Sequence, residues 1–173
     1  MRYLFLITVL AATALFTACS PTFNWRDVRL EQTSLAALLP CKPDQRVRVQ
    51  TLGGTEVSIT MLGCEAGGAL FTLAYADLKD PTLIGPVLAQ WKVTSLSNLR
   101  ATASTESPFV PRGARDLPQS VKLQVQGLRP DDSAVVLQSV WFASGSLVFQ
   151  AAVYADSAKP MATETFFSGL QLP

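Results

Sequence analysis

The stretch AVVLQSVWFASGSLVFQAAVYA, residues 134–155, carries the clearest structural signal in this chain. It contains two runs rich in β-branched and aromatic residues, 134–143 and 146–155, separated by Ser144-Gly145. Two such runs joined by a short turn with glycine predict a β-hairpin. Their apolar residues do not alternate cleanly with polar ones, so we expect the hairpin to be covered on both faces or to lie centrally in its sheet.

Further strands are predicted on the N-terminal side of this hairpin. The segment VKLQVQGL, 121–128, directly precedes it. Residues 46–78 contain three runs separated by Gly53-Gly54 and by 65–68, which predicts a three-stranded antiparallel meander. At the start of the polar chain, 23–30 is a candidate first strand. The next segment, SLAALLP, is too short for more than a helical turn stopped by Pro40.

In two segments the spacing of apolar residues changes from the period of a strand to that of a helix. Between Asp80 and Arg100, six residues fall three and four apart, which predicts one stripe of an amphipathic helix: Ile84, Val87, Leu88, Trp91, Ser95 and Leu99. A second, short helix is predicted over 158–170, with Met161, Thr165 and Phe166 on one side. Between the first helix and the strand at 121, a Ser-, Thr- and Pro-rich loop is expected over 101–119. Two helices and about six antiparallel strands give an α+β sandwich.

The N-terminal segment has the composition of an export signal. Residues 1–18 carry one positive charge near their start, Arg2, then an apolar run, and they end in small residues, as secretory signal peptides do. The run is too short and too rich in Thr and Ala for a membrane-spanning helix, which needs about 20 predominantly apolar residues. We therefore expect a signal peptide over 1–18, an N-terminal tether over 19–33 and one α+β domain over 34–173.

The end of this segment, Phe16-Thr17-Ala18-Cys19, resembles the lipobox of bacterial lipoproteins. The resemblance implies that the signal is cleaved before Cys19 and that Cys19 is acylated, with fatty chains such as palmitate anchoring the protein. The alternative is an ordinary secreted protein in which Cys19 is free or paired. Ser20 stands where inner-membrane lipoproteins usually have Asp, so the resemblance also implies the outer membrane, facing the periplasm.

Two further cysteines, Cys41 and Cys64, remain for the exported domain. An even number in an oxidising compartment favours a disulfide, which would close a loop of about 24 residues and stabilise the fold by roughly 3 kcal/mol. A reactive thiol or a metal site is the alternative. Because the chain contains no histidine, two isolated cysteines make a poor zinc site.

The layout of the chain resembles a known family. A segment LLPCKP, then the meander, a helix, three strands and a terminal helix in TETFFSGLQLP are similar to PsbP-like domains, including those of DcrB-type lipoproteins. The likeness covers roughly 40–173 and implies a central antiparallel sheet with helices packed on it. It implies no catalytic residue, because such domains mostly serve as accessory or interaction modules.

Charge and composition exclude several classes of function. Without Arg2 the 14 basic residues fall to 13 and equal the 13 acidic ones, so nucleic-acid binding is not expected. Arg46 and Arg48 alternate in RVRVQ, which places both on the outer, solvated face of a strand. The absence of histidine removes the usual general base near neutral pH and the common nucleophile-histidine pairs.

The remaining candidates for chemistry are carboxylates and tryptophans. Asp131-Asp132, Glu65, and Asp77 with Asp80 could serve a glycosidase or bind calcium, but adjacent acids in a proline-led turn are better explained as turn formers. The segment GCEAGG lacks the lysine and the following helix of a phosphate-binding loop. Tryptophans could line a ligand groove, although core packing is the default for each of them: Trp25, Trp91 and Trp141.

We therefore expect a non-enzymatic envelope lipoprotein without cofactor or metal, an accessory or docking module held at the membrane by its lipid. It is expected to bind another envelope protein through the sheet or through the 101–119 loop. The alternative is a periplasmic carrier of a small ligand or a carboxylate-only hydrolase of envelope polymers. A carrier or hydrolase should have a concave pocket with converging polar groups, whereas a docking module should have a flat or edge-exposed apolar surface. We expect no deep pocket.

Overall fold

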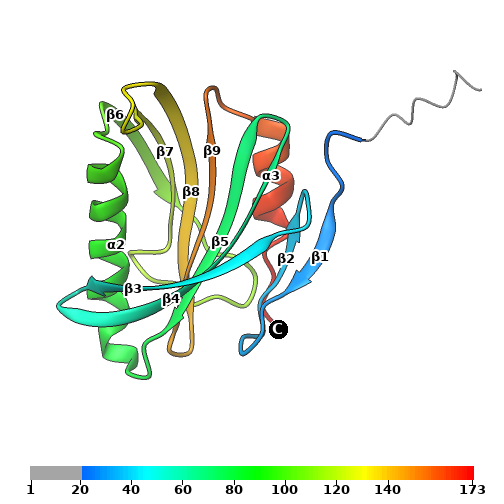
Figure 1. The fold of residues 1–173 in the computed structure, drawn as a ribbon. Helices are drawn as coiled ribbons and strands as arrows, with labels where there is room; N and C mark the ends of the chain where they lie inside the picture. Colours follow the sequence, from blue (N-terminus) through cyan, green and yellow to red (C-terminus); the bar gives the residue numbers. More distant parts are fainter. Residues whose placement is uncertain (1–20) are drawn as a thin grey trace, which may run out of the picture.

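The structure is a computed structural model of the chain and describes residues 21–173. Its main element is a seven-stranded sheet in the order β3-β4-β5-β9-β8-β7-β6, in which every neighbouring pair is antiparallel (Figure 1). The strands are β3 (Asp44–Leu52), β4 (Thr55–Ala66), β5 (Ala69–Asp77), β6 (Ala103–Pro108), β7 (Val121–Leu128), β8 (Ala134–Ser144) and β9 (Leu147–Ala155).

The predicted hairpin at 134–155 is confirmed as β8 and β9, and it occupies the middle of the sheet. Strand β9 pairs with β8 on one side and with β5 on the other. Both faces of β8 and β9 are buried along most of their length, which explains why their apolar residues do not alternate. The predicted meander is also confirmed, as β3, β4 and β5, with positive φ at Gly53, Gly54, Gly67 and Gly68 in its two turns.

The sheet has seven strands rather than the expected six. The additional strand, β6, lies inside the segment 101–119 that the sequence predicts to be a loop, and it pairs with β7 at the end of the sheet. All six of its residues are exposed. An edge strand that buries no side chain has no apolar alternation, so its sequence ASTESP looks like a loop.

A second, two-stranded sheet precedes the main one. Strands β1 (Arg26–Arg29) and β2 (Ala36–Leu39) form an antiparallel ribbon. The prediction of a helical turn over 34–40 is therefore wrong: Ala37 and Leu39 are buried while Ala36 and Leu38 are only partly buried, which is the period of a strand. The candidate strand over 23–30 is confirmed as β1.

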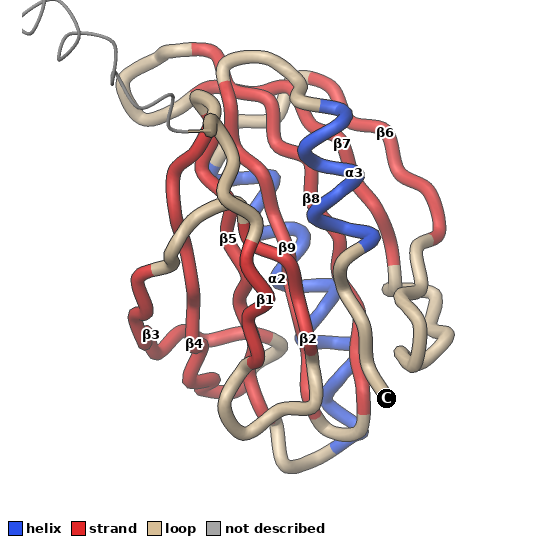
Figure 2. Tube along the Cα trace, turned by 90° about the vertical axis from the view of Figure 1, so that its right-hand side faces the viewer, coloured by secondary structure: helices blue, strands red, loops and turns tan. Residues whose placement is uncertain are grey.

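The sheet is covered on both faces. Helix α2 (Ile84–Asn98), with the short 3-10 helix η2 (Pro81–Leu83) before it, packs on one face, which we call the α2 face. Helix α3 (Pro160–Ser168) and the ribbon of β1 and β2 cover the other, the α3 face (Figures 1 and 2). Each face has its own apolar core, so the molecule is a three-layer α+β structure.

Helix α2 forms where the sequence predicts it. Its buried residues are Ile84, Val87, Leu88 and Trp91, all from the predicted stripe. Pro86 lies in the first turn, where its missing N–H costs no intrahelical bond. The Asp80 carboxylate accepts a hydrogen bond from the N–H of Thr82 at 2.8 Å and so caps η2.

Helix α3 packs through a different face from the predicted one. The buried residues are Ala162, Thr163, Phe166 and Phe167, whereas Met161 is 85% exposed and Thr165 is also exposed. Of the predicted side, only Phe166 is buried. Several stripes are possible on a helix this short and this apolar, and the position of the sheet selects one of them.

Ordered structure begins before residue 34, inside the range assigned to a tether over 19–33. Phe23 and Trp25 pack against the core of the α3 face, and Leu30 is 3% exposed. Burial of these apolar side chains attaches the segment to the domain. The predicted signal peptide, 1–18, and Cys19 lie outside the described residues.

Candidate functional site

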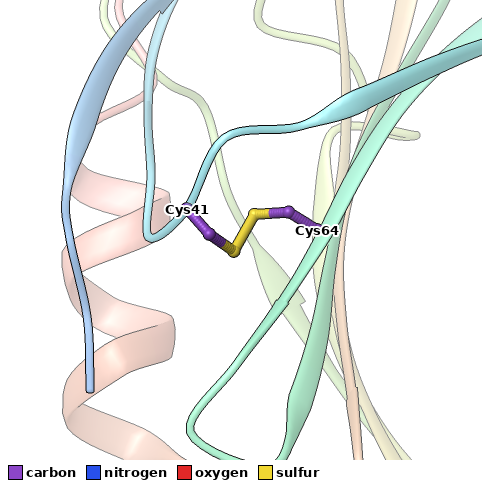
Figure 3. Close-up of a disulfide and its surroundings, with 2 residues drawn as sticks. All are labelled: Cys41 and Cys64. Carbon is purple, nitrogen blue, oxygen red and sulfur yellow. A yellow bond between two sulfur atoms is a disulfide. The ribbon is translucent and has the colours of Figure 1, made fainter. Parts of the chain in front are cut away.

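Cys41 and Cys64 form the predicted disulfide (Figure 3). Their Cα atoms lie 5.9 Å apart, within the ordinary range for such a bond. Cys41 follows β2, and Cys64 lies in β4, 23 residues further along the chain. The bond therefore attaches the end of the ribbon to the main sheet and is a structural link.

The paired acids Asp131 and Asp132 shape a turn. The Asp131 carboxylate accepts hydrogen bonds from the N–H of Ser133 at 3.1 Å and from its hydroxyl at 2.7 Å, and these bonds lower the pKa of Asp131. Asp132 has a φ of 66° and forms an ion pair of 2.7 Å with Arg100. The two acids are turn formers, as the sequence suggests.

Asp77 and Asp80 are similarly engaged. The Asp77 carboxylate accepts hydrogen bonds from the ammonium group of Lys79 and from the hydroxyl of Ser146, and the Lys79 bond contributes most to lowering the pKa of Asp77 to about 2. The bonds from Thr82 lower the pKa of Asp80. Since a lowered pKa keeps a carboxyl ionised at neutral pH, neither group has the protonation of a general acid.

The three tryptophans take part in packing. Trp141 is fully buried in β8, and Trp91 is 5% exposed on α2, both in the core of the α2 face. Trp25 stacks on Phe23 with ring centroids 5.8 Å apart and meets the edge of Phe71 at 6.2 Å. Core packing therefore accounts for all three.

The hollows on the surface are open to solvent. One of 610 Å³ lies between β6 and the segment 116–120. Another of 540 Å³ lies beside the disulfide, and it is bordered by Lys42, Asp44, Arg46 and Glu65. Within residues 21–173 no group of three or more Cys, Asp or Glu side chains is arranged to hold a metal ion. No helix in this part of the chain has both the length and the apolarity to span a membrane.

Strand β3 carries exposed apolar and basic side chains at one end of the sheet. It ends the sheet and pairs only with β4. On its α3 face Val47 and Val49 are 59% and 65% exposed. On its α2 face Arg46 and Arg48 are exposed, as predicted. We call these four residues, with the free backbone edge between them, the β3 edge surface.

Sequence reasoning identified only half of this surface. The alternation in RVRVQ assigns the arginines to solvent and the valines to the opposite face, and that assignment is correct. The same pattern normally means that the apolar face is buried. Whether a neighbouring layer extends far enough to cover the last strand depends on the tertiary arrangement, so the exposure of the valines could not be predicted.

The opposite edge of the sheet differs in each of these respects. Strand β6 is shorter, ends at Pro108 and carries no exposed branched aliphatic residue. Its Glu106 is engaged in an ion pair of 2.8 Å with Lys92 of α2. Short length, proline and satisfied charge are features that protect an edge strand from pairing with another chain. The β3 edge surface is therefore the better candidate for an interaction.

Comparisons with known proteins do not show which family this chain belongs to. No family model matches it, and no curated protein matches it. Among solved structures, it is similar to PA94, a Pseudomonas aeruginosa protein of unknown function, with 15% identity, 82% of this chain and 89% of that chain covered, and a TM-score of 0.40. A similarity at this TM-score and identity supports no conclusion about the fold or the function of this chain.

Proposed function

We propose that this protein is a non-enzymatic lipoprotein of a bacterial cell envelope, an accessory module that docks another envelope protein. The lipid on Cys19 anchors it in the outer membrane, facing the periplasm. Its domain belongs with the PsbP-like type, in keeping with a central antiparallel sheet covered by helices. The β3 edge surface is the observation that carries the docking role, because exposed aliphatic side chains on an unpaired strand favour association.

The carboxylates support docking over catalysis. Asp77, Asp80 and Asp131 accept hydrogen bonds from neighbouring turn residues. These bonds hold the side chains in place and stabilise their ionised forms, which leaves them poorly suited to donate protons. A hydrolase of envelope polymers would need two carboxyl groups facing each other across a substrate cleft.

The anchor holds the domain close to the membrane. Phe23 packs against Phe71 with ring centroids 6.3 Å apart, and Phe23 follows Cys19 by four residues. Four extended residues span at most about 14 Å. The ring of Phe23 also covers Gly67 in the turn between β4 and β5. In this proposal that turn therefore faces the lipid headgroups.

The anchor is tested by expressing the chain in a bacterium with an outer membrane and comparing it with the Cys19→Ser variant. We expect the wild-type protein to partition into detergent and to carry fatty acyl groups on Cys19 by mass spectrometry. The variant should retain its leader or appear in the soluble periplasmic fraction. An unprocessed wild-type chain that is free of lipid and soluble inside the cell would contradict the proposal.

Docking is tested by crosslinking in intact cells, followed by reconstitution of the captured pair from purified components. We expect one envelope protein to be captured reproducibly and to bind again in the purified system. A second lipoprotein of the same membrane, expressed at the same level, is the control. Recovery of a bound small molecule, with no protein partner, would instead favour a carrier.

A further inference from the structure

We infer that the β3 edge surface binds an extended segment of its partner as an eighth strand, and that this segment carries acidic residues on one face and aliphatic residues on the other. The inference rests on the proposed docking function and names where the contact lies and which side chains it selects. It follows from the backbone geometry of β3, the exposure of the valines and the charge of the arginines.

The turn between β3 and β4 determines which backbone groups of β3 are free. Leu52 and Thr55 flank the two-residue turn Gly53-Gly54, and in such a turn the first carbonyl accepts a hydrogen bond from the fourth N–H. Hydrogen-bonded and non-hydrogen-bonded pairs alternate along an antiparallel ladder. Arg46 and Arg48 therefore bond to β4, whereas Val47 and Val49 direct their N–H and C=O groups outward.

The side chains of the same residues divide between the two faces. Val47 pairs with Thr60, which in turn pairs with Tyr75 of the α3-face core, so the valines lie on the α3 face. Arg48 pairs with Ile59 of the α2-face core, so the arginines lie on the α2 face. The ribbon of β1 and β2 lies in front of the central strands, and β3 lies at the outer end of the sheet (Figure 2).

The exposed charges select the chemistry of the added strand. Within residues 21–173 neither Arg46 nor Arg48 forms an ion pair. Residues directly opposite each other on one face of an antiparallel pair attract if their charges are opposite and repel if their charges are alike. A strand with Glu or Asp opposite the arginines and Val, Ile or Leu opposite the valines satisfies both faces at once.

A second copy of this chain fits less well. In a two-fold antiparallel pairing of two β3 strands, the register that sets Val47 against Val49 also sets Arg48 against Arg48 of the other copy. Like charges directly opposite each other are destabilising. In that register the arginines therefore oppose self-association through the valines, while they favour an acidic partner.

A charge exchange tests the side-chain part of this inference. The probes are two short fluorescent peptides, one alternating Val with Glu and one alternating Val with Lys, and the protein is the full chain as processed by the cell. We expect the Val-Glu peptide to bind, and the double variant Arg46→Glu, Arg48→Glu to weaken that binding roughly tenfold and to bind the Val-Lys peptide instead. The control variant Arg26→Glu, Arg29→Glu makes the same change in net charge on β1 and should leave the preference unaltered. An unchanged preference in the β3 variant would overturn the inference.

A proline substitution tests the backbone part. Val49→Pro removes an outward N–H, and proline is tolerated on an edge strand where that group faces solvent. We expect the variant to keep its circular-dichroism spectrum and to lose binding of the Val-Glu peptide. Binding of the Val-Glu peptide by a folded Val49→Pro variant would overturn the backbone part, and if the variant fails to fold because proline fixes φ at this position, the charge exchange decides. A concentration-dependent dimer of the wild-type protein that Val49→Pro abolishes would show that a second copy is the occupant, against the inference.

The same variants separate this inference from the docking function. If crosslinking in cells captures the same envelope protein with Arg46→Glu, Arg48→Glu as with the wild type, docking stands and the β3 site is wrong. If neither protein captures a partner, the docking function itself fails. If the wild type captures a partner and the β3 variant does not, while the β1 control does, both are supported.

Discussion

At the scale of single residues, Asp77 makes stability depend on pH. Its pKa lies at about 2 in the folded chain, below the ordinary value of 3.8, chiefly because Lys79 donates a hydrogen bond to it. A lowered pKa contributes stability that is complete above about 3.8 and is lost as the pH falls toward 2. Lys79 is 83% exposed, so water and salt screen the interaction and the contribution stays below about 1 kcal/mol.

The variant Asp77→Asn should therefore be less stable than the wild type at neutral pH, by less than about 1 kcal/mol, and the difference should disappear near pH 2. Urea denaturation at a series of pH values measures it. Lys79→Gln should move the loss toward pH 3.8, since it removes the main cause of the shift. A difference that persists unchanged to pH 2 would show that Asp77 acts through something other than its charge.

Two buried hydroxyl groups on opposite faces of the sheet should respond in opposite ways to their removal. Within the described residues, the Ser139 hydroxyl is buried without a hydrogen-bond partner, whereas the Thr163 hydroxyl of α3 donates to the Gln138 side chain at 3.0 Å. Ser139→Ala should leave the free energy of unfolding unchanged or raise it, and Thr163→Val should lower it by about 1 kcal/mol. Thermal and urea unfolding of both variants test this. A loss above about 1 kcal/mol in Ser139→Ala would show that its hydroxyl is bonded.

At the scale of elements, α3 is held by its phenylalanines. Phe166 is fully buried and meets Phe71 with ring centroids 5.7 Å apart, while Met161 points to solvent. Phe166→Ala should cost about 3–5 kcal/mol, the usual loss for a buried aromatic. Met161→Ala on the same helix is the matched control and should change stability by less than about 0.5 kcal/mol. Equal effects in the two variants would mean that the helix packs through another face.

The disulfide fastens the ribbon to the sheet. In the double variant Cys41→Ser, Cys64→Ser the free energy of unfolding should fall by roughly 3 kcal/mol, because the unfolded chain without the closed loop has more conformational entropy. A reductant should produce the same loss in the wild type and none in the variant. If reduction leaves the wild-type midpoint in urea unchanged, the bond contributes nothing to stability.

Elements whose signal is local were predictable from the sequence. The strands of the β8–β9 hairpin and the meander carry their own glycine turns, α2 carries its own apolar stripe, and the pair Cys41 and Cys64 suggests a disulfide. Elements that depend on a neighbour were not. Strand β6 has no buried residue, and β2 takes its backbone partners from β1 and from Gln171 near the end of the chain. The exposure of Val47 and Val49 in the β3 edge surface was missed for the same reason, since it depends on where the covering layer ends.

At the scale of the whole molecule, the order of the strands separates a protected centre from accessible edges. Strands β5, β9 and β8 lie between other strands and are covered by α2 on one side and by α3 with the ribbon on the other. Strands β3 and β6 have no neighbouring strand along their outer sides, and most of their residues are exposed. Resistance to local unfolding should therefore be highest in the strands nearest the middle of the sheet and lowest at its edges.

That arrangement has a consequence for the exchange of amide protons with heavy water. The amides of β9 should exchange last and only through global unfolding, whereas the outward amides of Val47 and Val49 should exchange within the dead time of the experiment. A segment that bound along β3 would slow those two amides and leave β9 unchanged, because β9 already exchanges at the limit set by the whole fold. Comparing the exchange rates of the Val47 and Val49 amides with those of β9 would therefore detect a segment bound along β3, and the partner would need no label.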